Sequence, residues 1–166
     1  MAIQEIVDIM QEMTGLHQQL LELASQKKEA IIHNQVDQLN GLVNKESKLV
    51  KRVSELEEKR VFEADRYLVG KGYRPNPAIT VSDLTRIIVK AGEKQALIEA
   101  QAQLLEVLES LKAANKLNQE LAKQSLAFID YSLNLLVGAE DEAVYQNPQQ
   151  QSTGYGKRSG FFDSRA

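Results

Sequence analysis

The residues that most often do chemistry in proteins are few in this chain and widely spaced. Its 166 residues include two histidines, His17 and His33, and no cysteine. The histidines lie sixteen residues apart in one stretch of helical pattern, a separation of about 24 Å that prevents them from sharing a metal ion. His17 falls in the apolar seam of that stretch and is predicted to be a packed polar residue. We therefore expect no metal site, and without cysteine there is no thiolate nucleophile or disulfide framework.

Carboxylates and a glycine–lysine loop are the other chemical candidates. Aspartate and glutamate together number 23, but they fall on the polar faces of predicted helices, where no acid–base pair in a pocket is indicated. The loop Gly70-Lys71-Gly72 lacks the spacing of a phosphate-binding loop, follows no strand, and has no Ser or Thr after its lysine. A helix end with a turn explains it better. The sequence thus predicts no catalytic residue, no cofactor and no enzyme.

The elements that hold these residues are predicted to be long helices. The chain is rich in Ala, Leu, Glu, Lys and Gln, which favour helix. Helices can run uninterrupted between its three prolines, which are Pro75, Pro77 and Pro148. Apolar residues at alternating steps of three and four predict three long helices, over residues 2–32, 38–69 and 93–137.

Local signals mark where these helices begin and end. Asp37 is the predicted N-cap of the second helix. After the Gly/Pro loop, Thr80 and Asp83 match a capping box that opens a short helix through Val89. Gly92 is expected to mark the junction with the last helix. The predicted fold is all-α, an elongated antiparallel helical bundle or coiled coil of long helices with one short helix.

The chain is long enough for one helical domain, predicted over residues 1–137, with a tail over residues 138–166. The tail is expected to be flexible, because its Gln-, Ser- and Gly-rich stretch has no apolar pattern. A net charge of −3 gives no footprint for nucleic acid. No signal peptide and no apolar run of about 20 residues is present, so we expect a cytoplasmic protein without stable membrane insertion.

The last third of the long helix is apolar over more than half of its circumference. One apolar line comprises Leu117, Leu121, Phe128, Tyr131 and Leu135, and a second comprises Ala122, Leu126, Ile129, Leu133 and Leu136. The seam of a two-helix pair is much narrower than this. Periodicity alone leaves two interpretations open: other helices of the same chain cover both lines, or one line is offered to a partner.

Several short motifs resemble the FlgN family of flagellar export chaperones. The resemblance spans the whole chain and is most specific in the block from Asn118 to Leu136 taken together with the tail. That block contains an Asn-x-x-Leu motif, a Ser-Leu-x-Phe-Ile-Asp motif and a Leu-Leu pair, and the tail bears Tyr-Gly and a terminal Phe-Asp-x-Arg-Ala. The tail departs from the family in its longer Gln-rich stretch and in having two candidate tyrosines, Tyr145 and Tyr155.

The resemblance implies a protein that binds the terminal helices of hook-filament junction proteins (FlgK and FlgL type) before secretion. It also implies delivery to the cytosolic domain of the flagellar type III export gate (FlhA type). Docking on the gate would use Tyr155 and Gly156, favoured over Tyr145 because a glycine follows Tyr155. Client binding would use Leu117, Asn118, Leu121, Leu126, Phe128, Ile129, Leu133 and Leu136.

Two other functions fit the same periodicity. In a generic coiled-coil scaffold, the second apolar line would form a homodimer seam. A helical regulator would sequester a transcription-control protein. For the free chaperone, a monomer or a weak homodimer is expected.

Overall fold

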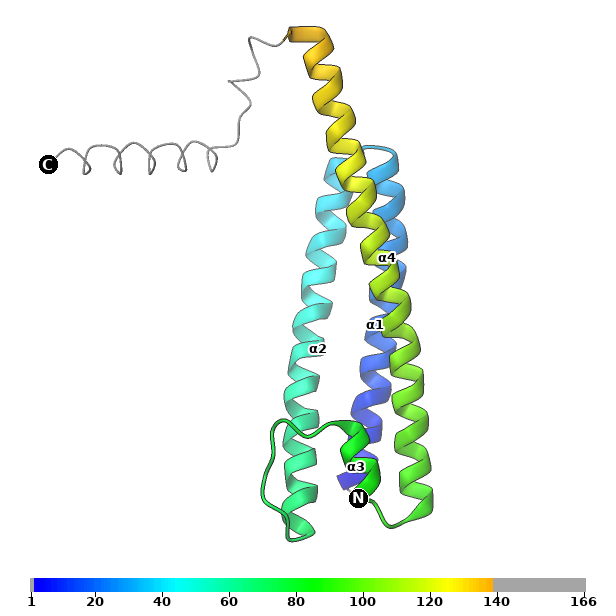
Figure 1. Ribbon diagram of the computed structural model, residues 1–166, viewed down its shortest axis with the longest axis vertical. Helices are drawn as coiled ribbons and strands as arrows, with labels where there is room; N and C mark the ends of the chain where they lie inside the picture. Colours follow the sequence, from blue (N-terminus) through cyan, green and yellow to red (C-terminus); the bar gives the residue numbers. More distant parts are fainter. Residues whose placement is uncertain (1, 139–166) are drawn as a thin grey trace, which may run out of the picture. The chain divides into compact units, whose positions relative to one another are not determined.

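The computed structural model describes residues 2–138, which form four α-helices and no strand. These are α1 (Ala2–Ile32), α2 (Val36–Gly70), α3 (Val81–Ile87) and α4 (Ala91–Val137). The chain divides into two units within α4, Met1–Ala122 and Lys123–Ala166. In the first unit α1, α2 and α4 run alternately up and down, with α3 at one end (Figure 1). The predicted all-α antiparallel bundle is confirmed.

The hairpin between α1 and α2 is tighter than the sequence suggested. Asn34 adopts a left-handed conformation with φ of 54°, which asparagine tolerates better than most residues and which reverses the chain directly after α1. Gln35 then occupies the N-cap position without a side-chain hydrogen bond, and α2 begins at Val36. The prediction that Asp37 caps this helix is wrong. Asp37 lies inside the first turn, where its negative charge still complements the helix dipole.

The main core lies at the end of the first unit where α1 begins, α2 ends and α4 begins. Its largest fully buried side chains are Ile3, Ile6, Met10, Leu56, Leu84 and Leu97. Burial of each such side chain contributes about 1.5–3 kcal/mol. A second, smaller cluster of Leu23, Ala30 and Leu42 lies near the α1–α2 turn. Packing is therefore densest at the α3 end of this unit.

The loop after α2 and the short helix follow their sequence signals. Lys71 is the C-cap of α2, and Gly72 has a φ of +84°, the conformation that favours glycine in such turns. The capping box is confirmed: the Thr80 hydroxyl accepts from Asp83 N at 3.1 Å, and the Asp83 carboxylate accepts from Thr80 N at 3.2 Å. α3 ends at Ile87, two residues before the predicted Val89, because Ile88 is already extended. Gly92 lies inside the first turn of α4.

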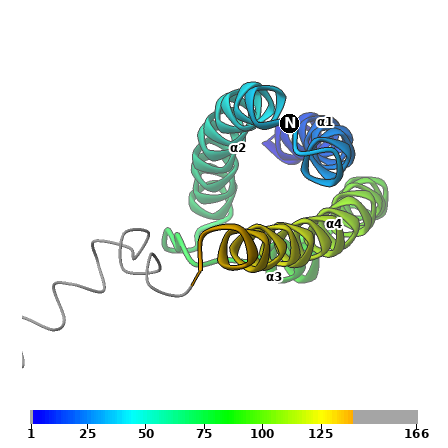
Figure 2. The ribbon, with the colours of Figure 1, turned by 90° about the horizontal axis from the view of Figure 1, so that it is seen from above.

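α1 and α2 are the closely packed pair of long helices. Ion pairs join them, between Arg52 Nη2 and Glu12 Oε1 at 2.7 Å and between Lys27 Nζ and Glu46 Oε2 at 2.8 Å. Seen along the helices, α1, α2 and α4 of this unit form a triangle rather than a row (Figure 2).

Candidate functional site

The predicted client-binding residues all lie on α4 and fall into two groups. Leu117, Asn118 and Leu121 belong to the first unit, whereas Leu126, Phe128, Ile129, Leu133 and Leu136 follow Lys123. The two groups have different surroundings.

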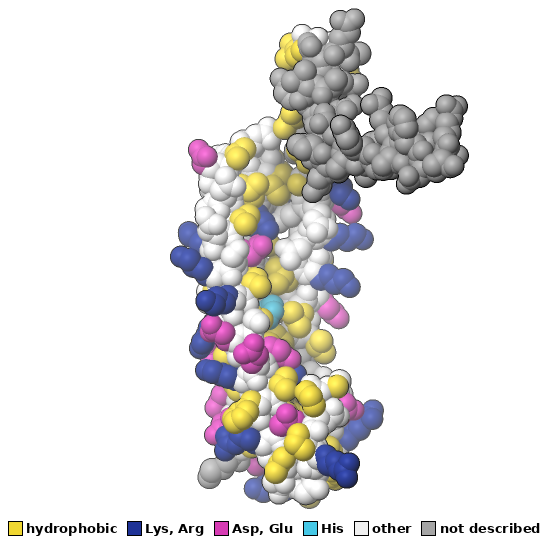
Figure 3. All heavy atoms as spheres, turned by 90° about the vertical axis from the view of Figure 1, so that its left-hand side faces the viewer, with side chains coloured by type: hydrophobic (Ala, Val, Ile, Leu, Met, Phe, Trp, Pro, Cys, Tyr) yellow, Lys and Arg dark blue, Asp and Glu magenta, His cyan; other side chains and the backbone are white. Residues whose placement is uncertain are grey.

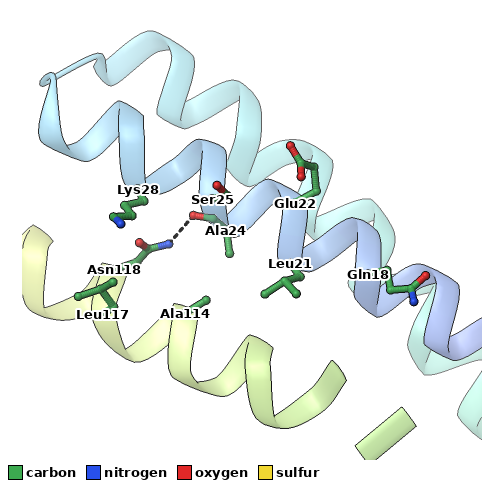
Figure 4. Close-up of a pocket in the computed structure, with 9 residues that line it drawn as sticks. All are labelled: Gln18, Leu21, Glu22, Ala24, Ser25, Lys28, Ala114, Leu117 and Asn118. Carbon is green, nitrogen blue, oxygen red and sulfur yellow. Dashed lines mark hydrogen bonds between the residues drawn. The ribbon is translucent and has the colours of Figure 1, made fainter. Parts of the chain in front are cut away.

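Asn118 is buried inside the first unit. Its side chain is only 5% exposed, and its Nδ2 donates to the main-chain oxygen of Ala24 on α1 at 2.8 Å (Figure 4). Leu97 and Leu104, also buried, precede it by multiples of seven residues, so all three point to the same side of α4. In this structure Asn118 therefore holds α4 against α1. The heptad spacing could have revealed this position from the sequence.

Leu117 borders a shallow depression of about 360 Å³ between α1 and α4. Leu21 and Ala114 supply further apolar lining, and Glu22 and Lys28 are among the polar residues that surround it (Figure 4). Leu117 is partly exposed at the edge, while Leu121, one turn further along, is half-buried. Charges of both signs, at Glu22 and Lys28, lie beside this mainly apolar depression.

Large apolar side chains are exposed along residues 123–137. Leu126 is 62% exposed, Phe128 68% and Leu136 83%. Ile129 is also exposed and Leu133 is half-buried. No residue of α4 after Asn118 is buried. Such a concentration of exposed apolar side chains is typical of an interaction surface.

Three further exposed residues of this stretch were not among the predicted binding residues. They are Tyr131, Leu135 and Val137. Tyr131 and Leu135 continue the apolar line through Leu121 and Phe128 at steps of three and four, so the periodicity already contained the signal.

The buried polar residues of the described chain, Thr14, His17 and Asn118, each have a main-chain partner. His17 is buried, and its Nδ1 lies 2.6 Å from the main-chain oxygen of Met13. Because a carbonyl oxygen only accepts, Nδ1 must carry the proton, as expected of a packed polar residue. Residues 2–138 contain no group of three or more His, Cys, Asp or Glu residues that could hold a metal ion.

No helix within residues 2–138 combines the length and the apolar character required to cross a bilayer. The predicted docking residues Tyr155 and Gly156 lie outside the described residues.

Comparison with known proteins identifies the family. The family described as FlgN protein matches residues 1–153. An uncharacterised protein, YvyG, of Bacillus subtilis (strain 168) is 26% identical over 166 residues, which cover 100% of both chains. No solved structure matches. With a family match over all of the described residues and a helical bundle whose last helix exposes an apolar surface, the chain belongs to the FlgN family of flagellar export chaperones.

Proposed function

We propose that this chaperone binds the terminal helices of hook-filament junction proteins in the cytosol, prevents their premature assembly and delivers them to the flagellar export gate. Family membership supports a role in flagellar export. The observation that carries the choice of surface is the row of exposed apolar side chains at the end of α4, including Leu126, Phe128 and Leu136.

The dimensions of this surface suit a helical client. Residues 123–137 span about 21 Å, or four helical turns. An amphipathic client helix would place its apolar residues at i, i+3, i+4 and i+7 against them. Shielding both apolar surfaces in one complex would keep the client from assembling before export.

A charge placed in this surface should weaken client binding without unfolding the chaperone. Leu126→Asp and Ile129→Asp replace exposed residues, so we expect their helix content to stay near that of the unchanged protein. Each loses an apolar contact worth about 1.5 kcal/mol or more, which corresponds to at least about tenfold in Kd. Titration calorimetry with the purified junction proteins of the source bacterium measures this.

Asn134→Asp is the matched control, because Asn134 is exposed and the change introduces the same carboxylate on the polar side of α4. Unchanged affinity in Leu126→Asp and Ile129→Asp would count against this surface.

The competing homodimer seam predicts something different. In that case free protein is a dimer by analytical ultracentrifugation, Leu126→Asp makes it a monomer, and no junction protein binds.

Delivery is a separate step with its own residues. We assign docking on the cytosolic domain of the export gate to Tyr155 and Gly156. The support comes from the tail sequence, which places Tyr155, Phe161 and Phe162 among polar residues. Isolated aromatics in a polar segment are typical of short motifs that order on docking.

Tyr155→Ala should leave client affinity unchanged but reduce capture of the chaperone–client complex by immobilised gate domain. A chain ending before Tyr145 should do the same. Full capture by both variants would remove the tail from the delivery step while leaving client binding intact.

A further inference from the structure

Basic residues gather at the end of the first unit where α2 ends and α4 begins, which is the lower end in Figure 1. They lie on the two connecting segments of this end and on the helix turns beside them. Five exposed residues make up this group, here named the basic tip: Lys71, Arg74, Arg86, Lys90 and Lys94.

The carboxylates of the same end are engaged within the protein. Four of them, on α2, α3 and α4, are only half-buried rather than exposed and have a hydrogen-bond or ion-pair partner: Glu63, Asp65, Asp83 and Glu93. Glu5 and Asp8 of α1 are exposed, and they interact with Arg66 and Gln4.

The basic tip, in contrast, keeps most of its charge free for a partner. Within residues 2–138 only Lys90 of this group forms an ion pair, with Glu93 at 3.6 Å, and its side chain is still 79% exposed. The Nζ of Lys71 lies 5.7 Å from the centre of the Tyr67 ring, a contact that leaves its charge in place. The outer layer of this end is therefore basic, above a layer of engaged carboxylates.

Exposed apolar side chains stand beside these cations. Val69 in the last turn of α2, Tyr73 next to Arg74, and Val89 next to Lys90 are 56%, 54% and 87% exposed. Figure 3 shows the left-hand side of Figure 1. Hydrophobic side chains gather at the lower end of this face, with Lys and Arg side chains projecting at their edges.

We propose that the basic tip binds the surface of an anionic lipid bilayer. The cations would contact the phosphate groups of the lipids, and Tyr73 and Val89 would reach the interface between head groups and acyl chains. Such binding is peripheral and requires no helix that spans the bilayer. It is an activity beyond the function proposed above, at a surface distinct from the end of α4.

The arrangement of these residues favours a bilayer over a helical partner. A bound helix needs a continuous apolar strip at i, i+3, i+4 and i+7, whereas Val69, Tyr73 and Val89 are single residues on three separate segments. A flat surface contacts both connecting segments at once. Outside the basic tip the chain carries a net charge of −3 − 5 = −8, which an anionic surface repels, so contact should be made through the tip alone.

The test uses the full-length chain and sedimentation with sucrose-loaded vesicles. We expect binding to vesicles of phosphatidylcholine with about 40% phosphatidylglycerol, and little binding to phosphatidylcholine alone. Each cation near an anionic surface contributes about fivefold to partitioning, so Lys71→Glu combined with Arg74→Glu should lower it at least about tenfold. Both residues are exposed, so the fold should tolerate the change.

Lys48→Glu combined with Lys112→Glu is the matched control, because both lysines are exposed and the change in net charge is the same. They lie more than about 25 Å from the basic tip along α2 and α4, well beyond the screening length of about 10 Å. Their partitioning should change less than about twofold. An equal loss in both double variants would show that net charge governs binding and would overturn the proposal.

The orientation on the bilayer provides an independent measurement. The chain has no cysteine, so Val89→Cys and Leu136→Cys can each carry one environment-sensitive fluorophore. We expect the emission at position 89 to shift to the blue on anionic vesicles. A shift at position 136 with none at position 89 would place the bilayer on the apolar end of α4 and overturn the proposal, as would equal binding to phosphatidylcholine alone.

Discussion

Asn118 is a polar residue in a seam that otherwise carries Leu97, Leu104 and Leu111 at the same heptad position. Its hydrogen bond to Ala24 O selects one alignment of α4 on α1, since a shift by one turn would leave the amide without this partner. The residue that the family resemblance assigned to client binding thus also has an internal role. The two roles are compatible if a client contacts the neighbouring Leu117, which remains partly exposed.

Substitutions at Asn118 should show how strongly the seam depends on this hydrogen bond. Asn118→Ala should lower the free energy of unfolding by about 1 kcal/mol, because Ala24 O keeps its bond within α1. Asn118→Asp should lower it by about 3 kcal/mol at neutral pH, because it buries a carboxylate against a carbonyl oxygen.

Burial would raise the pKa of the introduced carboxyl above its unfolded value. The folded state then binds more protons, so the deficit should shrink as the pH falls through that raised pKa. Urea unfolding at several pH values measures this, with Asn134→Asp as the exposed control. A deficit that does not change with pH would contradict a buried carboxylate at this position.

The guanidinium of Arg60 on α2 has hydrogen-bond acceptors for only two of its three nitrogens. Its Nε and Nη2 donate to the two carboxylate oxygens of Glu57 at 2.8 and 2.6 Å, while Nη1 is buried with no partner. The hydrogen bonds that Arg60 donates to Glu57 raise the pKa of Arg60 above its usual value, against the opposing effect of burial. The guanidinium is therefore stabilised by a single carboxylate.

This imbalance predicts opposite results for the two partners. Arg60→Met keeps the packing of the aliphatic stem and removes the unpaired donor, so stability should be unchanged or higher. Glu57→Ala should lower the free energy of unfolding by about 1–3 kcal/mol, because the guanidinium stays largely buried without an acceptor. Thermal unfolding measures both. Glu55→Ala, which removes one partner of the half-exposed Arg52, should change it by less than about 0.5 kcal/mol. Equal losses in Glu57→Ala and Glu55→Ala would contradict this account.

Among the elements, α3 depends most on its cap, because seven residues cannot hold a helix by backbone hydrogen bonds alone. Thr80→Ala should lower the free energy of unfolding by about 1 kcal/mol and speed amide exchange at Leu84 and Ile88. Thr85→Ala also removes a hydroxyl from α3, but that hydroxyl donates to Ser82 O rather than capping the helix. It should have a smaller effect, and equal effects would contradict the capping role.

The capping box also makes α3 sensitive to acid. Hydrogen bonds from the Thr80 side chain and backbone lower the pKa of Asp83 below its ordinary value of 3.8. A lowered pKa means that this stabilisation is complete above 3.8 and is lost as the pH falls through the folded-state value. Exchange at Leu84, corrected for intrinsic rates, should therefore rise below that pH, and Asp83→Asn should remove this dependence.

The sequence predicted the elements better than their junctions. Long apolar periodicity located α1, α2 and α4, and the Thr80–Asp83 pair located α3, because both signals act within a few residues. The N-cap of α2 was missed because Asn34 took the left-handed turn that placed Val36, not Gln38, first in the helix. Gly92 was expected at a break, but α4 begins one residue before it.

The surfaces were harder to predict than the helices. Two apolar lines at the end of α4 followed from periodicity, and heptad spacing from Leu97 and Leu104 indicates the side of α4 on which Asn118 lies. The hydrogen-bond partner of Asn118, Ala24 on α1, is 94 residues away in sequence and does not follow from that spacing. Such features arise from the arrangement of helices in three dimensions, which spacing along one helix does not contain.

At the scale of the whole molecule, buried side chains are unevenly distributed along the chain. The main core gathers residues such as Ile6, Leu56 and Leu97, whereas no residue of α4 after Asn118 is buried. A helical stretch of fifteen residues without burial is marginally stable in water. Opening should therefore require little free energy at residues 123–137 and nearly the full unfolding free energy in the core.

Amide exchange on the free protein should reveal this gradient. We expect fast exchange over residues 123–137, slow exchange around Ile6, Leu56 and Leu97, and a boundary near Asn118. Asn118→Ala should move the boundary back toward Leu104, the preceding buried residue of α4, because the hydrogen bond that joins Asn118 to Ala24 of α1 is lost. Saturating client should slow exchange over residues 123–137 at least about tenfold, since the bound helix must be released before opening. Uniform protection along α4, the same with and without client, would show that this stretch is already covered in the free protein and would place the client elsewhere.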